Sequence, residues 1–119
     1  MKINTMRIPC RCLIESEKFY TEKLGLNKVF GSPEEGFIGY QLENVQVLLE
    51  GEESGEFEAG RFLGFSLEVK NIHSFYETLT AKDVEFTGPP EKQLWGGLMT
   101  HIVDCNKNSF SIVQVDLAE

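Results

Sequence analysis

The sequence lacks the features of several large protein classes. No apolar run approaches the ~20 residues that cross a bilayer. The first residues, Met1–Thr5, open no long apolar stretch, so we expect no secretory signal, no membrane partner and, by default, a cytoplasmic location. Basic residues are few, since 11 Lys and Arg stand against 19 Asp and Glu for a formal net charge of −8. Because that charge repels a phosphate backbone, we expect no nucleic-acid partner.

Cysteine is also scarce. The three cysteines, Cys10, Cys12 and Cys105, are odd in number, and their spacing does not suggest a disulfide framework. A single Cys-x-Cys without a second pair is a poor zinc motif. We expect Cys10 to be a small buried side chain. Cys12 has no base that the sequence identifies, so a nucleophilic role for it stays undemonstrated.

What is present is typical of one small domain. The chain has 119 residues, and 41% of them are apolar, which is enough for a compact core. Five glutamates fall within Glu50–Glu58, together with Gly51, Ser54 and Gly55. Such a charged, glycine-containing stretch predicts a solvated loop.

The hydrophobic pattern repeats once along the chain. Strict alternation over 61–69 predicts a strand, and the apolar stripes over 14–24 and 72–82 predict helices. Gly25 suits a left-handed helix end, and Asn71 suits a helix start. The other predicted strands are about 3–10, 27–31, 36–42, 45–50, 84–87, 98–104 and 109–115. Each half therefore reads strand, helix, then three strands, which predicts a duplicated α+β fold.

Several short motifs resemble one superfamily. Phe19-Tyr20 followed by Leu24-Gly25 resembles its first helix ending, and 69–86 follows its strand–helix–strand pattern with Asp83 where Gly is usual. Trp95-Gly96-Gly97 resembles its Trp-Gly motif. Residues 104–108 resemble its Asp-Pro-Asp-Gly-Asn turn, with Lys107 in place of Gly and Asn106 expected to share the left-handed geometry. The order and spacing of these motifs are similar to those of the vicinal oxygen chelate superfamily, which contains glyoxalases, bleomycin-resistance proteins and extradiol dioxygenases.

The resemblance implies a specific architecture. It implies a single domain over 1–119 in which two βαβββ modules form a curved cup. Module one would cover about 1–50, an acidic linker 51–60, and module two about 61–119. Because single-chain members of the superfamily usually pair, it also implies a homodimer.

The resemblance also locates the positions where relatives hold a divalent metal through His, Glu or Gln. In this chain those positions fall on Thr5, Leu48, Gly64 and Ser111. Leu48 and Gly64 have no side-chain donor, and neutral hydroxyls such as Thr5 and Ser111 are poor ligands. We therefore expect no metal and no cofactor.

Taking those four positions as cup-facing fixes the parity of the strands. The predicted ligand-binding residues are Thr5, Arg7, Leu48, Glu50, Gly64, Ser66, Glu68, Trp95 and Ser111. Arg7 would hold a carboxylate or phosphate, or instead form a salt bridge to Glu50 or Glu68. Trp95 would stack on a flat or cationic ligand, or instead form an apolar plug at a loop or dimer contact.

Three functions are consistent with these residues. The first is a metal-independent small-molecule binding protein, similar to bleomycin-resistance proteins, that sequesters a cationic or aromatic compound. The second is a metal-dependent glyoxalase-like or dioxygenase-like enzyme with displaced ligands such as Glu50 and His101. The third is a metal-independent isomerase or lyase with Glu50 or Glu68 as its base. His73, in the first turn of a helix, is outside the cup, and the faces of Tyr40 and His101 are left open by the alternation.

Overall fold

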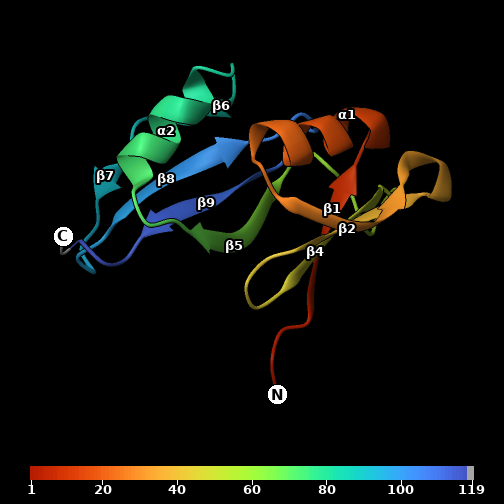
Figure 1. Cartoon of the computed structure of the whole chain (residues 1–119), viewed down its shortest axis with the longest axis horizontal. Helices are drawn as coiled ribbons and strands as arrows, with labels where there is room; N and C mark the ends of the chain where they lie inside the picture. Colours follow the sequence, from red (N-terminus) through yellow and green to blue (C-terminus); the bar gives the residue numbers. More distant parts are fainter. Residues whose placement is uncertain (118–119) are drawn as a thin grey trace. The chain divides into compact units, whose positions relative to one another are not determined.

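The computed structural model describes residues 1–117, and residues 118–119, the end of the predicted second module, lie outside the described part. The chain divides into two compact units, each with its own sheet (Figure 1). The first unit comprises Met1–Arg61 together with Cys105–Lys107. The second comprises Phe62–Asp104 and continues from Asn108.

The first unit is a four-stranded sheet with short helical segments. Its sheet has the order β1-β4-β3-β2, in which β1 is parallel to β4 and the other pairs are antiparallel. The elements in chain order are β1 (Thr5–Cys10), α1 (Leu13–Lys18), the π-helical η1 (Phe19–Lys23), β2 (Asn27–Ser32), the 3-10 turn η2 (Pro33–Glu35), β3 (Phe37–Gln41) and β4 (Gln46–Gly51).

The second unit repeats this order. Its sheet has the order β5-β9-β8-β6, with β5 parallel to β9, and a short β7 also pairs with β8. The elements are β5 (Phe62–Glu68), α2 (Ile72–Thr80), β6 (Glu85–Phe86), β7 (Glu91–Lys92), β8 (Leu98–Val103) and β9 (Ser109–Gln114). The predicted α+β duplication is thus confirmed, although β7 lies in a connection predicted as a loop. In each half the first strand is parallel to the last.

Each sheet buries one face, as the alternation predicts. The apolar buried residues of both sheets lie on the faces that the alternation predicts, although Thr100, Ser111 and Gln114 are also buried in the second sheet. In the first unit they are Ile8, Cys10, Ile38, Tyr40, Val47 and Leu49, with Phe19 and Tyr20 from η1. In the second they are Ile102, Phe110 and Ile112, with Ile72 and Leu79 from α2. Tyr40 and Cys10 therefore face inward.

The first helix differs from the uniform helix predicted over 14–24. It is α-helical only to Lys18 and continues as a π-helix, in which the Leu24 amide donates to the Phe19 carbonyl five residues earlier. The Tyr40 hydroxyl lies beside this segment, 2.9 Å from Thr21 Oγ1 and 3.5 Å from the Glu17 carbonyl oxygen. The apolar pattern over 14–24 could not predict these contacts, because Tyr40 lies on a strand that comes much later in the sequence. Gly25 adopts the expected left-handed conformation, with φ of 75°.

The helix of the second unit begins as predicted, whereas the turn between β8 and β9 differs from expectation. The Asn71 side chain accepts a hydrogen bond from the Ser74 amide at 3.0 Å, so it is the predicted helix N-cap. The expectation that Asn106 takes part in left-handed geometry is wrong, since Lys107 itself has φ of 67°. Asn106 is instead buried, and its Oδ1 accepts a hydrogen bond from the Arg11 amide at 2.8 Å.

The acidic stretch is an ordered loop of the first unit rather than a plain linker. Its glutamates are mostly exposed, as predicted, yet the loop is closed by its own hydrogen bonds. The Glu53 amide donates to the Phe57 carbonyl at 2.7 Å, and the Ala59 amide to Glu52 Oε1 at 3.0 Å. These bonds fix the position of Phe57, the only large apolar residue of the loop.

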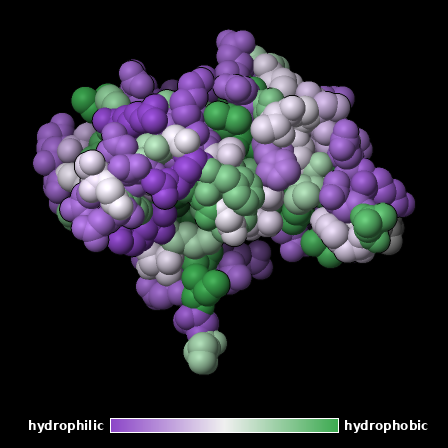
Figure 2. Space-filling model, turned by 180° about the vertical axis from the view of Figure 1, so that it is seen from behind, coloured by the Kyte–Doolittle hydropathy of each residue, from purple (hydrophilic) through white to green (hydrophobic). Residues whose placement is uncertain are grey.

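The surface is mixed, with hydrophilic areas and smaller hydrophobic areas between them (Figure 2). Residues 1–4 precede β1, and within them Ile3 is 70% exposed. In the described part of the chain, no helix is long and apolar enough to cross a membrane.

Candidate functional site

The face of the first sheet opposite α1 carries several polar and aromatic side chains. We call it the open face of the first sheet. Its residues are Thr5, Arg7, Phe30, Phe37, Gly39, Gln41, Gln46, Leu48 and Glu50. Of the predicted ligand-binding residues, Thr5, Arg7, Leu48 and Glu50 therefore lie on one surface.

Arg7 is held between a carboxylate and an aromatic ring. Its Nε donates to Glu50 Oε1 at 2.5 Å, and its Cζ lies 4.4 Å from the centre of the Phe57 ring. The salt bridge to Glu50, one of the two roles weighed for Arg7, is therefore formed. Because the Arg7 side chain is 54% exposed, we expect this pair to contribute at most about 1 kcal/mol to folding.

An aromatic pair covers the other side of the same face. The Phe30 ring lies over Gly39, where any side chain on residue 39 would collide with the ring. Its centre is 6.0 Å from that of Phe37. Phe30 reaches this place because the β2–β3 register shifts between Lys28 and Phe30, which leaves Val29 as an extra residue. The missing side chain of Gly39 thus makes room for an aromatic surface.

The face of the second sheet opposite α2 is built from smaller groups. Its β5 and β9 residues, Ser66 and Ser111, are directly paired, as are Glu68 and Val113. Gly64 sits in a bulge with φ of 78°, where a side chain would meet open space. Ser111 is only 5% exposed, so little of its hydroxyl is open to solvent.

The pairing of β8 with β9 shows which face of the second sheet His101 occupies. His101 pairs with Ser111, so it shares the face of the hydroxyls rather than that of Ile102. Its ring packs edge-on against the Phe62 ring, with centres 5.7 Å apart. His73 is exposed at the second position of α2.

Trp95 lies apart from the residues of the second sheet. It is in the turn closed by the Gln93 amide and the Gly97 carbonyl, and its ring covers Gly97. The Trp95 residue is 54% exposed and its neighbour Leu94 fully exposed. The ring therefore packs on its own turn, and both roles weighed for Trp95 stay predictions.

The side chains do not fit the divalent metal of the superfamily resemblance. The positions of its ligands are held here by Thr5, Leu48, Gly64 and Ser111, which offer two neutral hydroxyls and no imidazole or carboxylate. Among residues 1–117, no group of three or more His, Cys, Asp or Glu is arranged to hold a metal ion. In the displaced-ligand alternative, Glu50 already forms a salt bridge with Arg7, and the His101 ring packs against the Phe62 ring.

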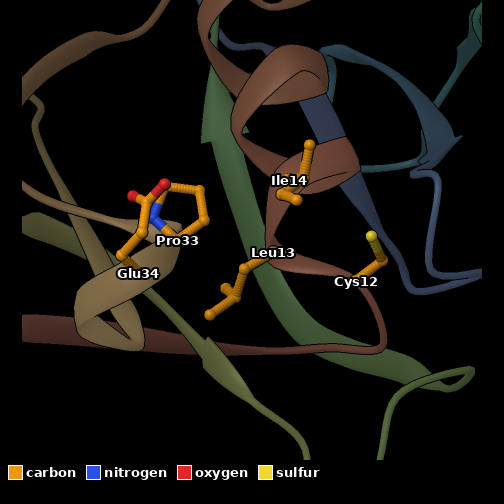
Figure 3. A pocket seen from close by; sticks show the side chains of 5 residues that line it. All are labelled: Cys12, Leu13, Ile14, Pro33 and Glu34. Atoms are coloured by element: carbon orange, nitrogen blue, oxygen red, sulfur yellow. The ribbon is translucent and has the colours of Figure 1, made fainter.

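A separate hollow lies at the start of α1. It has a volume of about 350 Å³ and is lined by Cys12, Leu13, Ile14, Pro33 and Glu34, so that α1 and η2 form its two walls (Figure 3). It is wide open and contains one carboxylate and one thiol. The arrangement of the Cys12 thiol and the Glu34 carboxylate in this hollow does not indicate a catalytic or metal-binding role.

Two groups on the helix side of the first sheet have shifted pKa values. Burial raises the pKa of the Tyr40 phenol, against the opposing effect of its hydrogen bond to Thr21. The hydrogen bond to Glu17 raises the pKa of the exposed Lys28 ammonium. Both groups lie away from the open face, so their shifts concern folding rather than ligand binding.

Three aromatic residues of these surfaces escaped the sequence analysis. Phe57 lies in an irregular loop, and Phe30 follows a bulge that reverses the strand parity. Phe62 is the first residue of β5, at the end of the alternating pattern. The Gly39–Phe30 contact had one weak signal, a glycine inside a predicted strand, which is typical of a close approach by another group.

Comparisons with known proteins agree with this fold. The family model described as "Glyoxalase/Bleomycin resistance protein/Dioxygenase superfamily" matches residues 2–112. No curated protein sequence matches the chain. A solved member of that superfamily from Sphaerobacter thermophilus is 29% identical, with a TM-score of 0.84, and the match covers 96% of this chain and 97% of the other.

Two more distant structures show the same fold. An antibiotic binding protein from Streptomyces sp. has a TM-score of 0.83 at 15% identity, covering 96% of this chain and 95% of that one. A lactoylglutathione lyase from Agrobacterium tumefaciens has a TM-score of 0.77 at 15% identity, covering 95% and 92%. At such identities the likeness concerns the fold alone, and the fold serves both a binding protein and an enzyme.

Proposed function

Because the chain belongs to the Glyoxalase/Bleomycin resistance protein/Dioxygenase superfamily, we propose that it has kept the scaffold for metal-independent binding of a small molecule. The ligand is a cationic or aromatic compound that the protein sequesters without turnover. The observation that carries the proposal is the side-chain content of the open faces. Two hydroxyls, a leucine and a glycine stand where a metal enzyme of this family needs imidazole and carboxylate ligands, and aromatic rings and an ion pair lie beside them on the first sheet.

The fold serves both binding and catalysis in proteins of similar structure. One structural neighbour is named as an antibiotic binding protein, and its chain is covered almost completely. The open face of the first sheet combines the apolar side chains of Leu48, Phe30 and Phe37 with the ion pair of Arg7 and Glu50, the two kinds of group that line small-molecule sites. Glu50 and Glu68 are less suited to act as a base, because Glu50 is paired with Arg7 and Glu68 is exposed. The homodimer and the cytoplasmic location stay predictions of the sequence.

The test separates binding from metal chemistry. The protein is dialysed against a chelator, its metal content is measured, and it is titrated by calorimetry with a panel of planar aromatic and cationic compounds. We expect at least one panel member to bind with 1:1 stoichiometry, unaffected by the chelator, and to be recovered unchanged. Stoichiometric retained metal with chelator-sensitive binding would favour the displaced-ligand enzyme. Conversion of the bound compound by metal-free protein would favour the isomerase or lyase, and binding of no compound would contradict the proposal.

A further inference from the structure

One row of residues crosses the open face of the first sheet on all four strands. Arg7 pairs with Leu48, Leu48 with Gly39, and Gly39 with Phe30. With strands ~4.8 Å apart, β1 and β3 are separated by about 10 Å. Between the guanidinium and the Phe30 ring the row carries only Leu48, because Gly39 has no side chain. A planar ring system placed between Arg7 and the Phe30 ring would therefore rest on Leu48.

The polar end of the row is preorganised. Glu50 holds Arg7 Nε, and the Phe57 ring packs against the guanidinium. The two terminal amino groups of Arg7 make no further hydrogen bond within residues 1–117, and neither does the second carboxylate oxygen of Glu50. A ligand therefore meets fixed N–H donors directly beside a fixed acceptor.

The charges decide which ligand chemistry suits this end. Glu50 compensates the charge of Arg7, and the whole chain carries −8, so an anionic group gains little there and meets repulsion from the rest of the protein. A cation gains from Glu50 but is repelled by Arg7. An uncharged group that both accepts and donates, such as a carboxamide, satisfies both partners without separating them.

We propose that the open face of the first sheet binds planar aromatic compounds that carry an uncharged donor–acceptor group. The rings lie over Leu48 and against Phe30, and the polar group bonds to Arg7 and Glu50. The inference rests on the proposed binding function and names the ligand class for one of its surfaces. It also gives the Phe57 contact a role, because a guanidinium held from two sides loses less freedom when a ligand binds.

The experiment compares three probes that differ only in the polar group: naphthamide, naphthoate and naphthylmethylammonium. Each is titrated into the full-length protein at about 150 mM salt while backbone amide NMR shifts are followed. We expect naphthamide to bind about tenfold more tightly than the other two and to shift the amides of β1, β3 and β4. Substitution Arg7→Lys, which keeps the charge but loses the planar fork, should weaken naphthamide about tenfold. Substitution Phe30→Leu should weaken it about fivefold.

The matched control is Arg61→Lys. Arg61 forms an exposed ion pair with Glu58 at 3.1 Å, and we expect naphthamide affinity to stay within about twofold of the unmodified protein. Thermal unfolding of every variant verifies that a loss of binding is not a loss of folding. Equal or tighter binding of naphthoate, or unchanged affinity in Arg7→Lys, would overturn the inference. If no probe shifts these amides but a compound of the calorimetry panel still binds elsewhere, this inference fails and the proposed binding function stands. If no panel compound binds either, the inference and the proposed function are both contradicted.

Discussion

The two units share one strand order and one kind of buried face, yet their open faces differ. In the first, β1 runs parallel to β4 and presents Arg7 and Glu50 beside aromatic rings. In the second, β5 runs parallel to β9 and presents Gly64, Ser66 and Ser111. The buried faces are both aliphatic and aromatic, because each must pack against a helix. Burial thus constrains one face of each strand and leaves the other free to acquire binding chemistry.

The largest expected effect tests the equivalence of the buried faces. Leu49 on β4 and Ile112 on β9 are both 0% exposed. We expect Leu49→Ala and Ile112→Ala each to lower the free energy of unfolding by about 3 kcal/mol in urea denaturation, through lost burial and a residual cavity. Leu48→Ala, on the adjacent residue facing the other way, should cost less than about 1.5 kcal/mol. Equal losses for Leu48 and Leu49 would show that the open face is part of the core.

The next effect concerns the equivalent hairpins, β3–β4 and β8–β9. The turn at 42–45 has an exposed Asn44, whereas Asn106 at the tip of the other hairpin is 2% exposed. Asn106 Oδ1 accepts the Arg11 amide at 2.8 Å, and Asn106 Nδ2 donates to Ser16 Oγ at 3.0 Å. We expect Asn106→Ala to cost about 2 kcal/mol because these buried groups lose their partner.

Asn44→Ala is the matched control for that substitution. It changes the same side chain in the equivalent hairpin, and we expect the free energy of unfolding to stay within about 0.5 kcal/mol of the unmodified protein. A cost for Asn106→Ala no larger than that of the control would mean that the buried amide contributes nothing beyond its volume.

A smaller effect distinguishes the units by pH. Tyr40 is the buried phenol of the first sheet, and burial raises its pKa above the ordinary value. Its neutral form is therefore favoured in the folded protein. The resulting stability is complete below about pH 10 and is lost as the pH rises through the folded-state pKa. We expect Tyr40→Phe to cost about 1 kcal/mol at neutral pH and to flatten the decline of stability above about pH 10. Urea denaturation across that range measures both, and an unchanged decline would assign it to other groups.

The sequence predicted most of the fold. At the first open face it predicted the polar residues Arg7 and Glu50 and also Leu48, but not the aromatic residues Phe30 and Phe57. Alternation is a local signal, so it placed Leu48 and Glu50 on one face of their strand and Leu49 on the other. The superfamily resemblance then placed Arg7 on the same face as Leu48. It could not place Phe57, since a loop has no period, or Phe30, since a one-residue bulge reverses parity. Tyr40 shows the same limit, because its hydroxyl bonds to a helix 19 residues earlier in the chain.

The smallest expected effect compares the two helix ends. Gly25 and Asp83 follow the helical segments of the first and second units, with φ of 75° and 64°. Left-handed backbone costs an L-residue free energy that glycine avoids, although Asp tolerates it better than most. We expect Asp83→Gly to raise the free energy of unfolding by about 0.5 kcal/mol. We expect Gly25→Ala, whose new methyl group would meet no atom within 4 Å, to lower it by about 1 kcal/mol. Opposite signs would show that the position of Asp83 disfavours a side chain as the position of Gly25 does; a loss in both would mean that the Asp83 side chain stabilises the second helix end by itself.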